Sequence, residues 1–453
     1  MLPMFAHQQV TSDLLVARNG ALVLNDPGTG KTRSVLEAFR TRKELGQLDK
    51  LLVLAPLSIL EPAWGGDIRK WTPDLTYQVV TARSKWKGFA EPADVYITNH
   101  DAVKWMIKDW DNKGFRWALC VDEFTVYKHR TSQRSKAVGT LAKHFDAVWM
   151  LSGTPNSNTV TDIWYPAYLV DQGERLGRSF WGFRAQVCTP VQVGPNPNMV
   201  EWRDKPHANE IIADRLKDIS VRFKLEDCVD LPENSVHTLT VGMNPRLRKQ
   251  YEQMRDNAML ELAENDNISA IHAGVVAQKL LQICAGAVYN ADGEYRVLGD
   301  DRTELVMDLI EERHDPVLVA FNWQHQKDLL VAAATKRKIP YAVIDGTVPA
   351  KDRNLYVELF QAGKLKVIFA HPQSAGHGLT LTRGSTTIWA SPTYNAEFFQ
   401  QFNRRVYRTS QTKRTETILI AAEDTVEQRV YEKLNGKVER MTDLLNLFQE
   451  LAA

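Results

Sequence analysis

Short apolar runs alternate with longer stretches of helical character along most of the chain. In the first half, five runs have the length and composition of buried parallel strands, at 21–24, 50–56, 94–98, 117–123 and 147–155. A second series follows at 315–321, 341–346, 366–370 and 387–390. Because strands that alternate with helices form parallel sheets covered on both faces, this pattern predicts an α/β fold. We expect two doubly wound parallel-sheet lobes with helical insertions between them.

The middle of the chain departs from this alternation. The proline-containing run 191–206 predicts a loop or an extended arm. Three aromatic residues of this region could stack on bases beside Arg184 and Arg203, although core packing is their commoner role. They are Trp181, Phe183 and Trp202.

Helical insertions are predicted farther along. Asn244 as N-cap and Pro245 at the first helical position predict a helix that runs past residue 262, and 268–283 predicts a second one. We therefore divide the chain into two domains: residues 1–230, with a helical and irregular insertion from about 165, and residues 231–453, with a helical insertion at about 244–300 and a helix at the C-terminal end.

The turn after the first strand carries the clearest chemical signal. Gly28 and Gly30 allow backbone N–H groups to face a phosphate, and the following helix offers its N-terminus to the same anion. Lys31 can reach the β- and γ-phosphates, and the hydroxyl of Thr32 can ligate Mg²⁺. Asn25 stands where the strict phosphate-loop pattern has glycine. The order of strand, glycine turn, Lys-Thr and helix favours a nucleotide site over an ordinary turn before a surface helix.

Two further groups could complete such a site. Phe5 and Gln8 precede the loop on a short helical stretch, where an aromatic ring can stack on adenine and an amide can contact its edge. An N-terminal Gln is, however, usually just solvated. Asp122 and Glu123 end an apolar strand, and such strand ends carry the ligands in open α/β sheets. Asp122 would hold Mg²⁺ through water, while Glu123 would orient and deprotonate the attacking water.

The second half contributes a basic group. Gln401, Arg405 and Arg408 are spaced as i, i+4 and i+7, which predicts that they share one helix face. Two aligned arginines could supply the positive charge that the transition state of phosphoryl transfer needs. The alternative is a solvated basic helix, but an intact phosphate loop in the same chain favours the catalytic role.

Composition narrows the class of protein. The chain has 453 residues, of which 44% are hydrophobic and 25% charged, as in globular proteins of two to three domains. We see no membrane span and no secretory signal, and we expect a cytoplasmic protein of a bacterium or a virus-infected host cell, or a nuclear one if the source is a eukaryote. The four cysteines show no C-x-x-C spacing, which argues against a disulfide framework or a zinc site. The net charge of +1 means that contacts to nucleic acid would come from local patches.

Taken together, these motifs resemble those of the Swi/Snf-type ATPases of helicase superfamily 2. The resemblance covers nearly the whole chain and is carried by Pro56-Leu57-Ser58, Asp122-Glu123 with Lys128, Ser152-Gly-Thr154-Pro155, Gly346 with Arg353, Gly376-x-Gly378, Arg405-x-x-Arg408 and Thr425-Val-Glu427. Thr125 departs from it, because the family usually has a histidine there that helps to couple hydrolysis to DNA binding. The chain looks like a bare motor, as in viral or bacterial members.

The resemblance implies two RecA-like lobes with ATP and Mg²⁺ between them. The catalytic residues would be Lys31, Asp122, Glu123, Arg405 and Arg408. ATP would contact Phe5, Gln8, Asp26, Pro27, Gly28, Thr29, Gly30, Lys31, Thr32, Gly378 and Gln401, and Mg²⁺ would contact Thr32 and Asp122. Nucleic acid would contact Ser58, Thr98, Asn99, His100, Lys128, Thr154 and Ser374.

The expected function is that of an ATP-dependent translocase that moves along or remodels DNA. Duplex DNA is the favoured partner, with single-stranded and forked DNA left open, and a protein partner for targeting is also left open. One alternative is a helicase that separates the strands of DNA or RNA. An alternative of another class is a nucleic-acid-binding module that ATP switches without processive movement.

Overall fold

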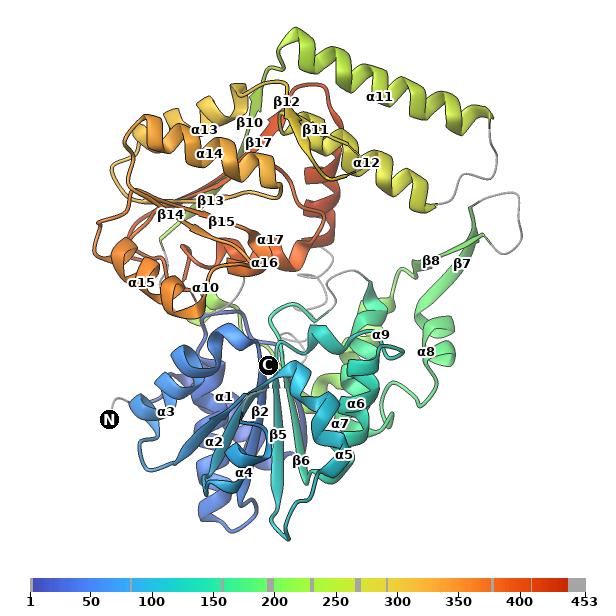
Figure 1. Cartoon of the computed structure of the whole chain (residues 1–453). Coiled ribbons are helices and arrows are strands. Elements are labelled where there is room, and N and C mark those ends of the chain that lie inside the picture. The colour runs from blue at the N-terminus through green and yellow to red at the C-terminus, as the bar shows by residue number, and fades with distance from the viewer. Residues whose placement is uncertain are drawn as a thin grey trace. The chain divides into compact units, whose positions relative to one another are not determined.

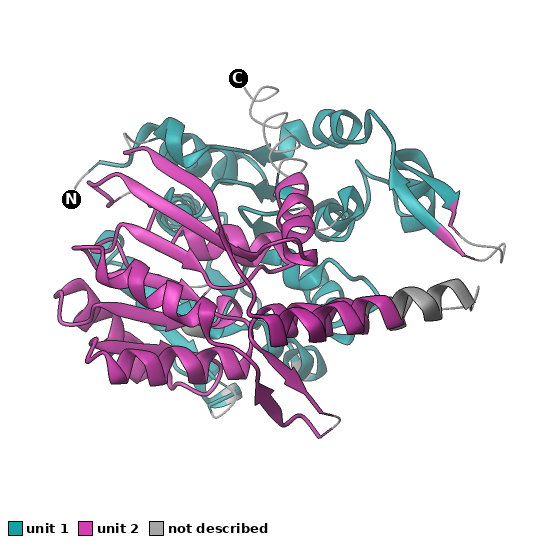
Figure 2. Ribbon diagram, turned by 90° about the horizontal axis from the view of Figure 1, so that it is seen from above, with its two compact units in different colours: residues 1–191, 201–230, 438–453 teal, residues 192–200, 231–437 magenta. Residues whose placement is uncertain are grey.

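The structure is a computed structural model of the chain, and its contacts divide it into two compact units. It describes residues 3–81, 84–155, 159–193, 199–228, 232–264, 270–290, 292–375, 379–408 and 410–438, with side chains except at 58, 86, 109, 258–264 and 270–274. Unit 1 comprises residues 1–191, 201–230 and 438–453, and unit 2 comprises residues 192–200 and 231–437 (Figure 2).

Unit 1 is built on a seven-stranded parallel sheet. Its strands are β1 (Gly20–Val23), β2 (Lys50–Ala55), β3 (Tyr77–Val80), β4 (Val95–Asn99), β5 (Trp117–Asp122), β6 (Ala147–Leu151) and β9 (Ser220–Val221), in the order β3-β4-β2-β5-β6-β1-β9. The five predicted strands are confirmed. The sequence did not reveal β3, which is only half-buried at the sheet edge, or β9, which is two residues long.

Helices cover both faces of this sheet (Figure 1). Those of unit 1 are α1 (Ala6–Ala17), α2 (Lys31–Glu44), α3 (Gly66–Trp71), α4 (Trp86–Ala90), α5 (Val103–Asp109), α6 (Gln133–Leu141), α7 (Trp164–Asp171), α8 (Phe180–Val187), α9 (Ala208–Leu216) and α10 (Leu225–Cys228). Alternate residues of each strand enter opposite cores, since Leu52 packs with Met106 of α5 while Val53 packs with Phe39 of α2. Burial on both faces explains why these strands read as continuous apolar runs.

The predicted arm of unit 1 is partly strand. Cys188–Gln192 (β7) pairs with Val200–Asp204 (β8) in a separate two-stranded sheet. The extended alternative for 191–206 is therefore right and the loop alternative is wrong for β8. Pro195 and Pro197 lie outside the described residues, and Pro206 follows the strand.

Unit 2 contains a second parallel sheet, of six strands. These are β10 (Asn234–Val241), β13 (Val317–Ala320), β14 (Tyr341–Ile344), β15 (Val367–Ala370), β16 (Thr386–Trp389) and β17 (Thr415–Ala422), in the order β10-β17-β16-β13-β15-β14. The helices beside it are α13 (Asp301–Glu311), α14 (Gln324–Lys336), α15 (Ala350–Gln361), α16 (Pro372–Ala375) and α17 (Ala396–Asn403). The prediction of an α/β fold with two parallel-sheet lobes is confirmed.

The insertion of unit 2 consists of α11 (Pro245–Glu264), α12 (Ala270–Cys284) and the antiparallel pair β11 (Ala287–Tyr289) and β12 (Tyr295–Val297). Asn244 caps α11 as predicted, because its Oδ1 accepts a hydrogen bond of 2.9 Å from Leu247 N. Residues 426–438 are helical, where the described chain ends.

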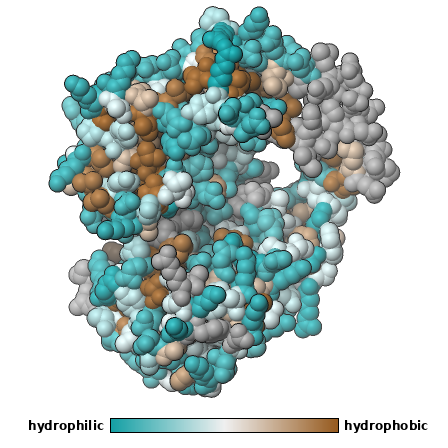
Figure 3. All heavy atoms as spheres, viewed as in Figure 1, coloured by the Kyte–Doolittle hydropathy of each residue, from teal (hydrophilic) through white to brown (hydrophobic). Residues whose placement is uncertain are grey.

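Hydrophilic residues cover much of the visible face of the molecule, and hydrophobic residues show between them (Figure 3). Among the described residues, no helix combines the length and the apolar character needed to cross a membrane.

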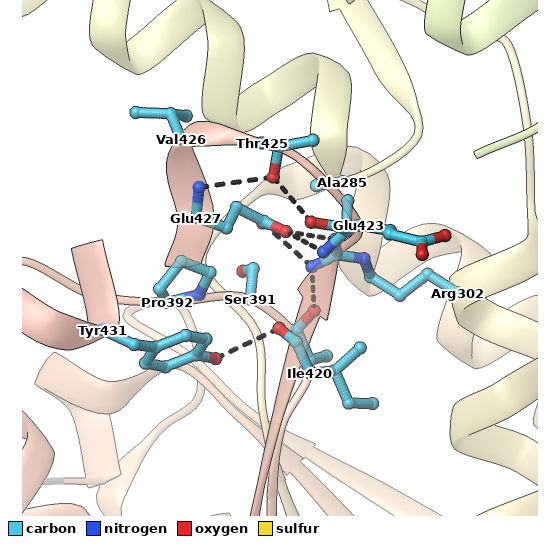
Figure 4. A network of polar contacts seen from close by, with 12 residues as sticks. Ala285, Arg302, Ser391, Pro392, Ile420, Glu423, Thr425, Val426, Glu427 and Tyr431 are labelled. Carbon is cyan, nitrogen blue, oxygen red and sulfur yellow. Dashed lines mark hydrogen bonds and ion pairs between the residues drawn. The ribbon is translucent and has the colours of Figure 1, made fainter. Parts of the chain in front are cut away.

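A buried ion pair organises the end of unit 2 (Figure 4). Arg302, in the first turn of α13, places Nη1 3.0 Å from Oε1 of Glu427 and Nη2 2.5 Å from its Oε2. Nη1 also donates to the carbonyl oxygen of Ala390 after β16, at 2.7 Å, and Glu427 accepts from Ala422 N at the end of β17, also at 2.7 Å. Burial alone would lower the pKa of Arg302, but the charge and hydrogen bonds of Glu427 raise it. This pair ties the C-terminal helix to two strand ends.

We expect Glu427→Ala to lower the free energy of unfolding by about 3–5 kcal/mol, because it leaves the guanidinium of Arg302 buried without its counter-charge. Denaturant unfolding monitored by circular dichroism measures this loss. The control is Glu423→Ala, since the side chain of Glu423 is exposed. Equal stability of the two variants would contradict a structural role for the ion pair.

Candidate active site

The carboxyl ends of the strands of unit 1 bring most of the predicted residues of this unit to one edge of the sheet. Because neighbouring strands are parallel, the segments that follow β1, β4, β5 and β6 leave the sheet on the same side. These segments carry the glycine turn, Asn99, Asp122 with Glu123, and Ser152. Gly153 packs so closely on the glycine turn that a Cβ atom there would lie 2.6 Å from Pro27 Cδ.

The glycine turn itself has the backbone of a phosphate-binding loop. Gly28 has a φ of 93° and Gly30 a φ of 81°, a region that other residues rarely adopt. A Cβ atom at Gly30 would also collide with the side-chain amide of Gln8. Helix α2 begins directly afterwards at Lys31, so its N-terminal N–H groups face the turn.

Lys31 is held inside the loop by backbone oxygens. Its Nζ donates to the carbonyl oxygen of Asn25 at 2.9 Å and to that of Asp26 at 3.3 Å. Burial lowers the pKa of Lys31, and the carboxylates of Glu123, Asp122 and Asp26 oppose this shift. The loop therefore already encloses a cation where the phosphates of a nucleotide are expected.

The departure from the strict pattern at Asn25 has a structural explanation. Asn25 Nδ2 donates to Thr11 Oγ1 of α1 at 2.9 Å, and its Oδ1 accepts from Phe223 N at 2.9 Å. The side chain is 1% exposed and bridges two segments that lie far apart in the sequence. A glycine at this position could not make either hydrogen bond.

Asp26 anchors the base of the same loop. Its Oδ1 accepts a 2.7 Å hydrogen bond from Nη2 of Arg222, and its Oδ2 accepts from Leu225 N at 3.0 Å. Arg222 also donates to the carbonyl oxygen of Leu24 at 3.0 Å. The carboxylate of Asp26, predicted to contact ATP, is thus engaged by the segment that follows β9.

The residues upstream of the loop lie against it. Gln8 Nε2 donates to the carbonyl oxygen of Thr29 at 3.1 Å, and His7 Nε2 lies 2.9 Å from the same oxygen. Gln8 is 6% exposed, whereas Phe5 is 58% exposed and stacks on the His7 ring at 5.7 Å. Phe5 is therefore the open aromatic surface beside the loop.

The acid pair is set by two residues that the sequence did not single out as part of the site. Trp64 donates through Nε1 to Asp122 Oδ2 at 3.0 Å, from a π-helical turn over Leu60–Gly65. Ser152 Oγ donates to Glu123 Oε2 at 3.3 Å and accepts from Thr154 N at 3.1 Å. Glu123 has a φ of 59°, which turns the chain sharply after β5. Ser152 could have been found from its position at a strand end and from its place in the Ser152-Gly-Thr154-Pro155 motif.

The residues predicted to contact nucleic acid have mixed environments. Thr98 is fully buried, with Oγ1 donating to the carbonyl oxygen of Val80 at 2.7 Å. His100 Nδ1 lies 3.1 Å from the hydroxyl of Tyr127, and Lys128 pairs with Asp162 at 3.5 Å. Thr154 is 1% exposed, Asn99 and Ser374 are partly exposed, Thr125 is buried, and the side chain of Ser58 lies outside the described residues.

The predicted helical face of Gln401, Arg405 and Arg408 is wrong. Helix α17 ends at Asn403, so both arginines lie in the turns after it. They nevertheless converge, because Nη1 of Arg405 and Nη1 of Arg408 donate to the same carbonyl oxygen, that of Leu379, at 3.4 and 3.1 Å. The turn after α17, and not the spacing of residues on a helix, brings the two guanidinium groups together. Gly376 and Gly378 lie outside the described residues, and Gln401 is 1% exposed.

Two parts of the chain each match the model of a known protein family. Residues 8–285 match the model of the SNF2-related domain, and residues 301–410 match that of the helicase conserved C-terminal domain. The chain is 29% identical over 440 residues to protein p41 of Acyrthosiphon pisum secondary endosymbiont phage 1, and the match covers 92% of each chain.

Other relatives are longer than this chain. It is 24% identical to an uncharacterised ATP-dependent helicase of Mycoplasma genitalium and to the SWI/SNF-related matrix-associated actin-dependent regulator of chromatin subfamily A-like protein 1 of Xenopus tropicalis. The matches cover 96% and 94% of this chain but 41% and 43% of those proteins, so this chain spans less than half of their length. Among solved structures, the Sulfolobus solfataricus SWI2/SNF2 ATPase core in complex with dsDNA aligns with a TM-score of 0.46 and 22% identity, over 98% of this chain and 93% of that one.

The bridge made by Asn25 yields a prediction. Asn25→Gly restores the strict phosphate-loop pattern, yet we expect it to lower the free energy of unfolding by about 1–3 kcal/mol, because Phe223 N loses its buried acceptor. Thermal unfolding measures the change. Asn25→Ala removes the same two hydrogen bonds without the added backbone freedom of glycine, so its stability should fall between those of the natural chain and Asn25→Gly. A glycine variant as stable as the natural chain would contradict the bridge.

Proposed function

Since the chain belongs to the SNF2-related family, whose members are ATP-hydrolysing enzymes of helicase superfamily 2, we propose that it is a nucleic-acid-dependent motor that moves along or remodels duplex DNA. The single observation that carries the proposal is the convergence of Lys31, Asp122 and Glu123 at one edge of a parallel sheet. The likeness to a phage protein favours action in the cytoplasm of an infected bacterium.

In this proposal the phosphates of ATP occupy the turn 26–32. Lys31 Nζ exchanges two carbonyl oxygens for the β- and γ-phosphates, because a cation bonds an anionic oxygen more strongly than a neutral one. The N–H groups at the start of α2 bind the same oxygens. Phe5 offers its exposed ring to the base, and the amide of Gln8 lies beside it.

The residues around Asp122 fit a magnesium ion. Mg²⁺ prefers oxygen ligands and is commonly held by one or two carboxylates together with phosphates and water, and Asp122 and Thr32 provide such oxygens. When bound, the ion would neutralise charge on the phosphates. Trp64 fixes the carboxylate of Asp122 by its hydrogen bond, so the orientation of this group is set in advance.

Glu123 is the proposed base for the attacking water. The hydroxyl of Ser152 donates to one oxygen of this carboxylate and so orients the group. Ser152 also accepts the N–H of Thr154, a residue expected to contact nucleic acid. A contact of nucleic acid with Thr154 could therefore affect Glu123 through Ser152. This coupling would not involve Thr125, the position at which the family usually has a histidine.

The arginines of unit 2 complete the proposal. We assign Arg405 and Arg408 to the stabilisation of charge on the γ-phosphoryl group in the transition state. What supports this role is that their guanidinium groups meet at the carbonyl oxygen of Leu379, which gathers two positive charges at one point of unit 2.

The function is tested by ATPase rates measured without polymer and with single-stranded DNA, blunt duplex, forked DNA and RNA, beside a strand-displacement assay. We expect stimulation by duplex DNA without strand displacement, and at least a roughly 100-fold loss of turnover in Lys31→Ala with the circular dichroism spectrum unchanged. The control is Lys108→Ala, since Lys108 is exposed.

Each other outcome selects a different function. Displacement of a strand would identify a helicase, and nucleotide-dependent binding without turnover would identify an ATP-gated binding module. Normal turnover in Lys31→Ala would refute the assignment of the phosphate loop.

For Arg405→Ala and Arg408→Ala we expect unchanged ATP affinity with kcat reduced by about 10³-fold or more, because the arginines act on the transition state. Titration with a fluorescent ATP analogue and single-turnover hydrolysis separate the two quantities. Arg383→Ala is the matched control, since Arg383 is exposed in the same unit. Hydrolysis at the natural rate in both variants would remove the arginines from the mechanism.

A further inference from the structure

An exposed tryptophan of unit 1 has two arginines near its ring and is not among the residues assigned above. Trp181 on α8 is 61% exposed, whereas Phe183 on the same helix is 1% exposed and belongs to the core. The guanidinium carbon of Arg130 lies 5.7 Å from the ring centre of Trp181, and that of Arg184 lies 5.3 Å from it. Core packing therefore accounts for Phe183 but not for Trp181.

A further cation–π contact connects Arg184 to β8. Arg184 also lies over the ring of Trp202, with its guanidinium carbon 3.8 Å from the ring centre. Arg130, Trp181, Arg184 and Trp202 thus alternate cation and aromatic ring across three separate segments of the chain. We call these four residues the stacking patch.

The patch rests on a firm base. Phe180 and Trp202 are partly buried and pack against the larger core of unit 1, and Phe180 meets the ring of Trp181 at 5.5 Å. An aromatic surface held in this way loses little conformational freedom when a ligand stacks on it. Its geometry is therefore present before binding.

The arginines of the patch keep their hydrogen-bond donors available. Neither Arg130 nor Arg184 forms a hydrogen bond or an ion pair with the described part of the chain, although each contacts aromatic rings. By contrast, Arg134 pairs with Asp101 and Arg175 pairs with Asp218. A planar guanidinium with free donors is suited to a phosphate.

The charge pattern around the patch favours an anionic partner. Residues 124–145 contain five Lys or Arg and no Asp or Glu, and residues 175–200 contain three Arg and no Asp or Glu. These two acid-free stretches meet where Arg130 lies over Trp181. Arg134 and Arg175 are paired with acids from other segments, whereas Arg130 and Arg184 have no acidic partner in the described part of the chain, so the positive charge available to a ligand lies at the patch itself.

We propose that the stacking patch binds unpaired nucleotides of a nucleic-acid strand, with bases on Trp181 and phosphates on Arg130 and Arg184. An exposed ring flanked by free cations meets both requirements of single-strand binding, namely a surface for stacking and positive charge along the backbone. Paired bases cannot present their faces to the ring. This inference rests on the proposed nucleic-acid-dependent function and adds to it a contact for single-stranded segments.

The test compares binding of a fluorescein-labelled thymidine oligonucleotide and of a blunt duplex of two separate, fully paired strands to the full chain, by fluorescence anisotropy without ATP. We expect Trp181→Ala to weaken binding of the oligonucleotide about 5- to 150-fold and to change binding of the duplex less than about twofold. Trp181→Tyr should retain most of the affinity. Arg130→Gln should lower the slope of log affinity against log salt by about 0.7.

Phe115→Ala is the matched control, because Phe115 is 43% exposed in the same unit and lies 5.2 Å from the Nζ of Lys50. If Trp181→Ala behaves like this control, or weakens duplex and oligonucleotide equally, the inference is overturned while the proposed function stands. If the natural chain binds neither probe, both fail.

Discussion

Parallel hydrogen bonding in the sheet of unit 1 is the constraint on which the rest of the site depends. It sends the chain out of β1, β4, β5 and β6 at the same edge, so that the glycine turn, the acid pair and Ser152 become neighbours although Ser152 lies 29 residues after Glu123 and the glycine turn lies much farther away in the sequence. The strands themselves are buried on both faces, which leaves only their ends free to carry polar chemistry. The candidate site residues of unit 1 therefore follow the ends of buried strands at one edge of the sheet.

Within that frame, polar side chains hold the phosphate loop at its base and leave its inner surface to Lys31. Asn25 joins the loop to α1 and to Phe223, and Asp26 joins it to Arg222. Both side chains are buried, and their partners lie in other segments of the chain. The bonds from Lys31 to backbone oxygens are different, because a phosphate can replace them. The loop thus combines side chains that hold its base with one lysine whose hydrogen-bond acceptors a phosphate can replace.

Much of the fold could be predicted because its signals are local. Continuous apolar runs, a glycine turn before Lys31 and the Asn244-Pro245 cap each reflect the chemistry of a few adjacent residues, and the structure contains the corresponding strands, turn and helix. Elements whose stability comes from distant partners were missed. β10 is largely exposed and gains its place by pairing with β17, and β9 is two residues long beside β1. The helix expected to carry Arg405 and Arg408 ends early for the same reason, since contacts to Leu379 set the path of the chain there.

The α/β class, the strands that form continuous apolar runs, the glycine turn and the acid pair at a strand end could be predicted from the residues alone, because periodicity and turn chemistry depend on neighbouring residues. How these parts are supported depends on contacts between segments that are distant in the sequence. Asn25 is explained by its hydrogen bonds to Thr11 and Phe223, Glu123 is oriented by Ser152, and Trp181 is exposed near Arg130 and Arg184. Folding brings the two residues of each pair into hydrogen-bond or van der Waals contact. Their spacing along the chain therefore does not reveal the contact.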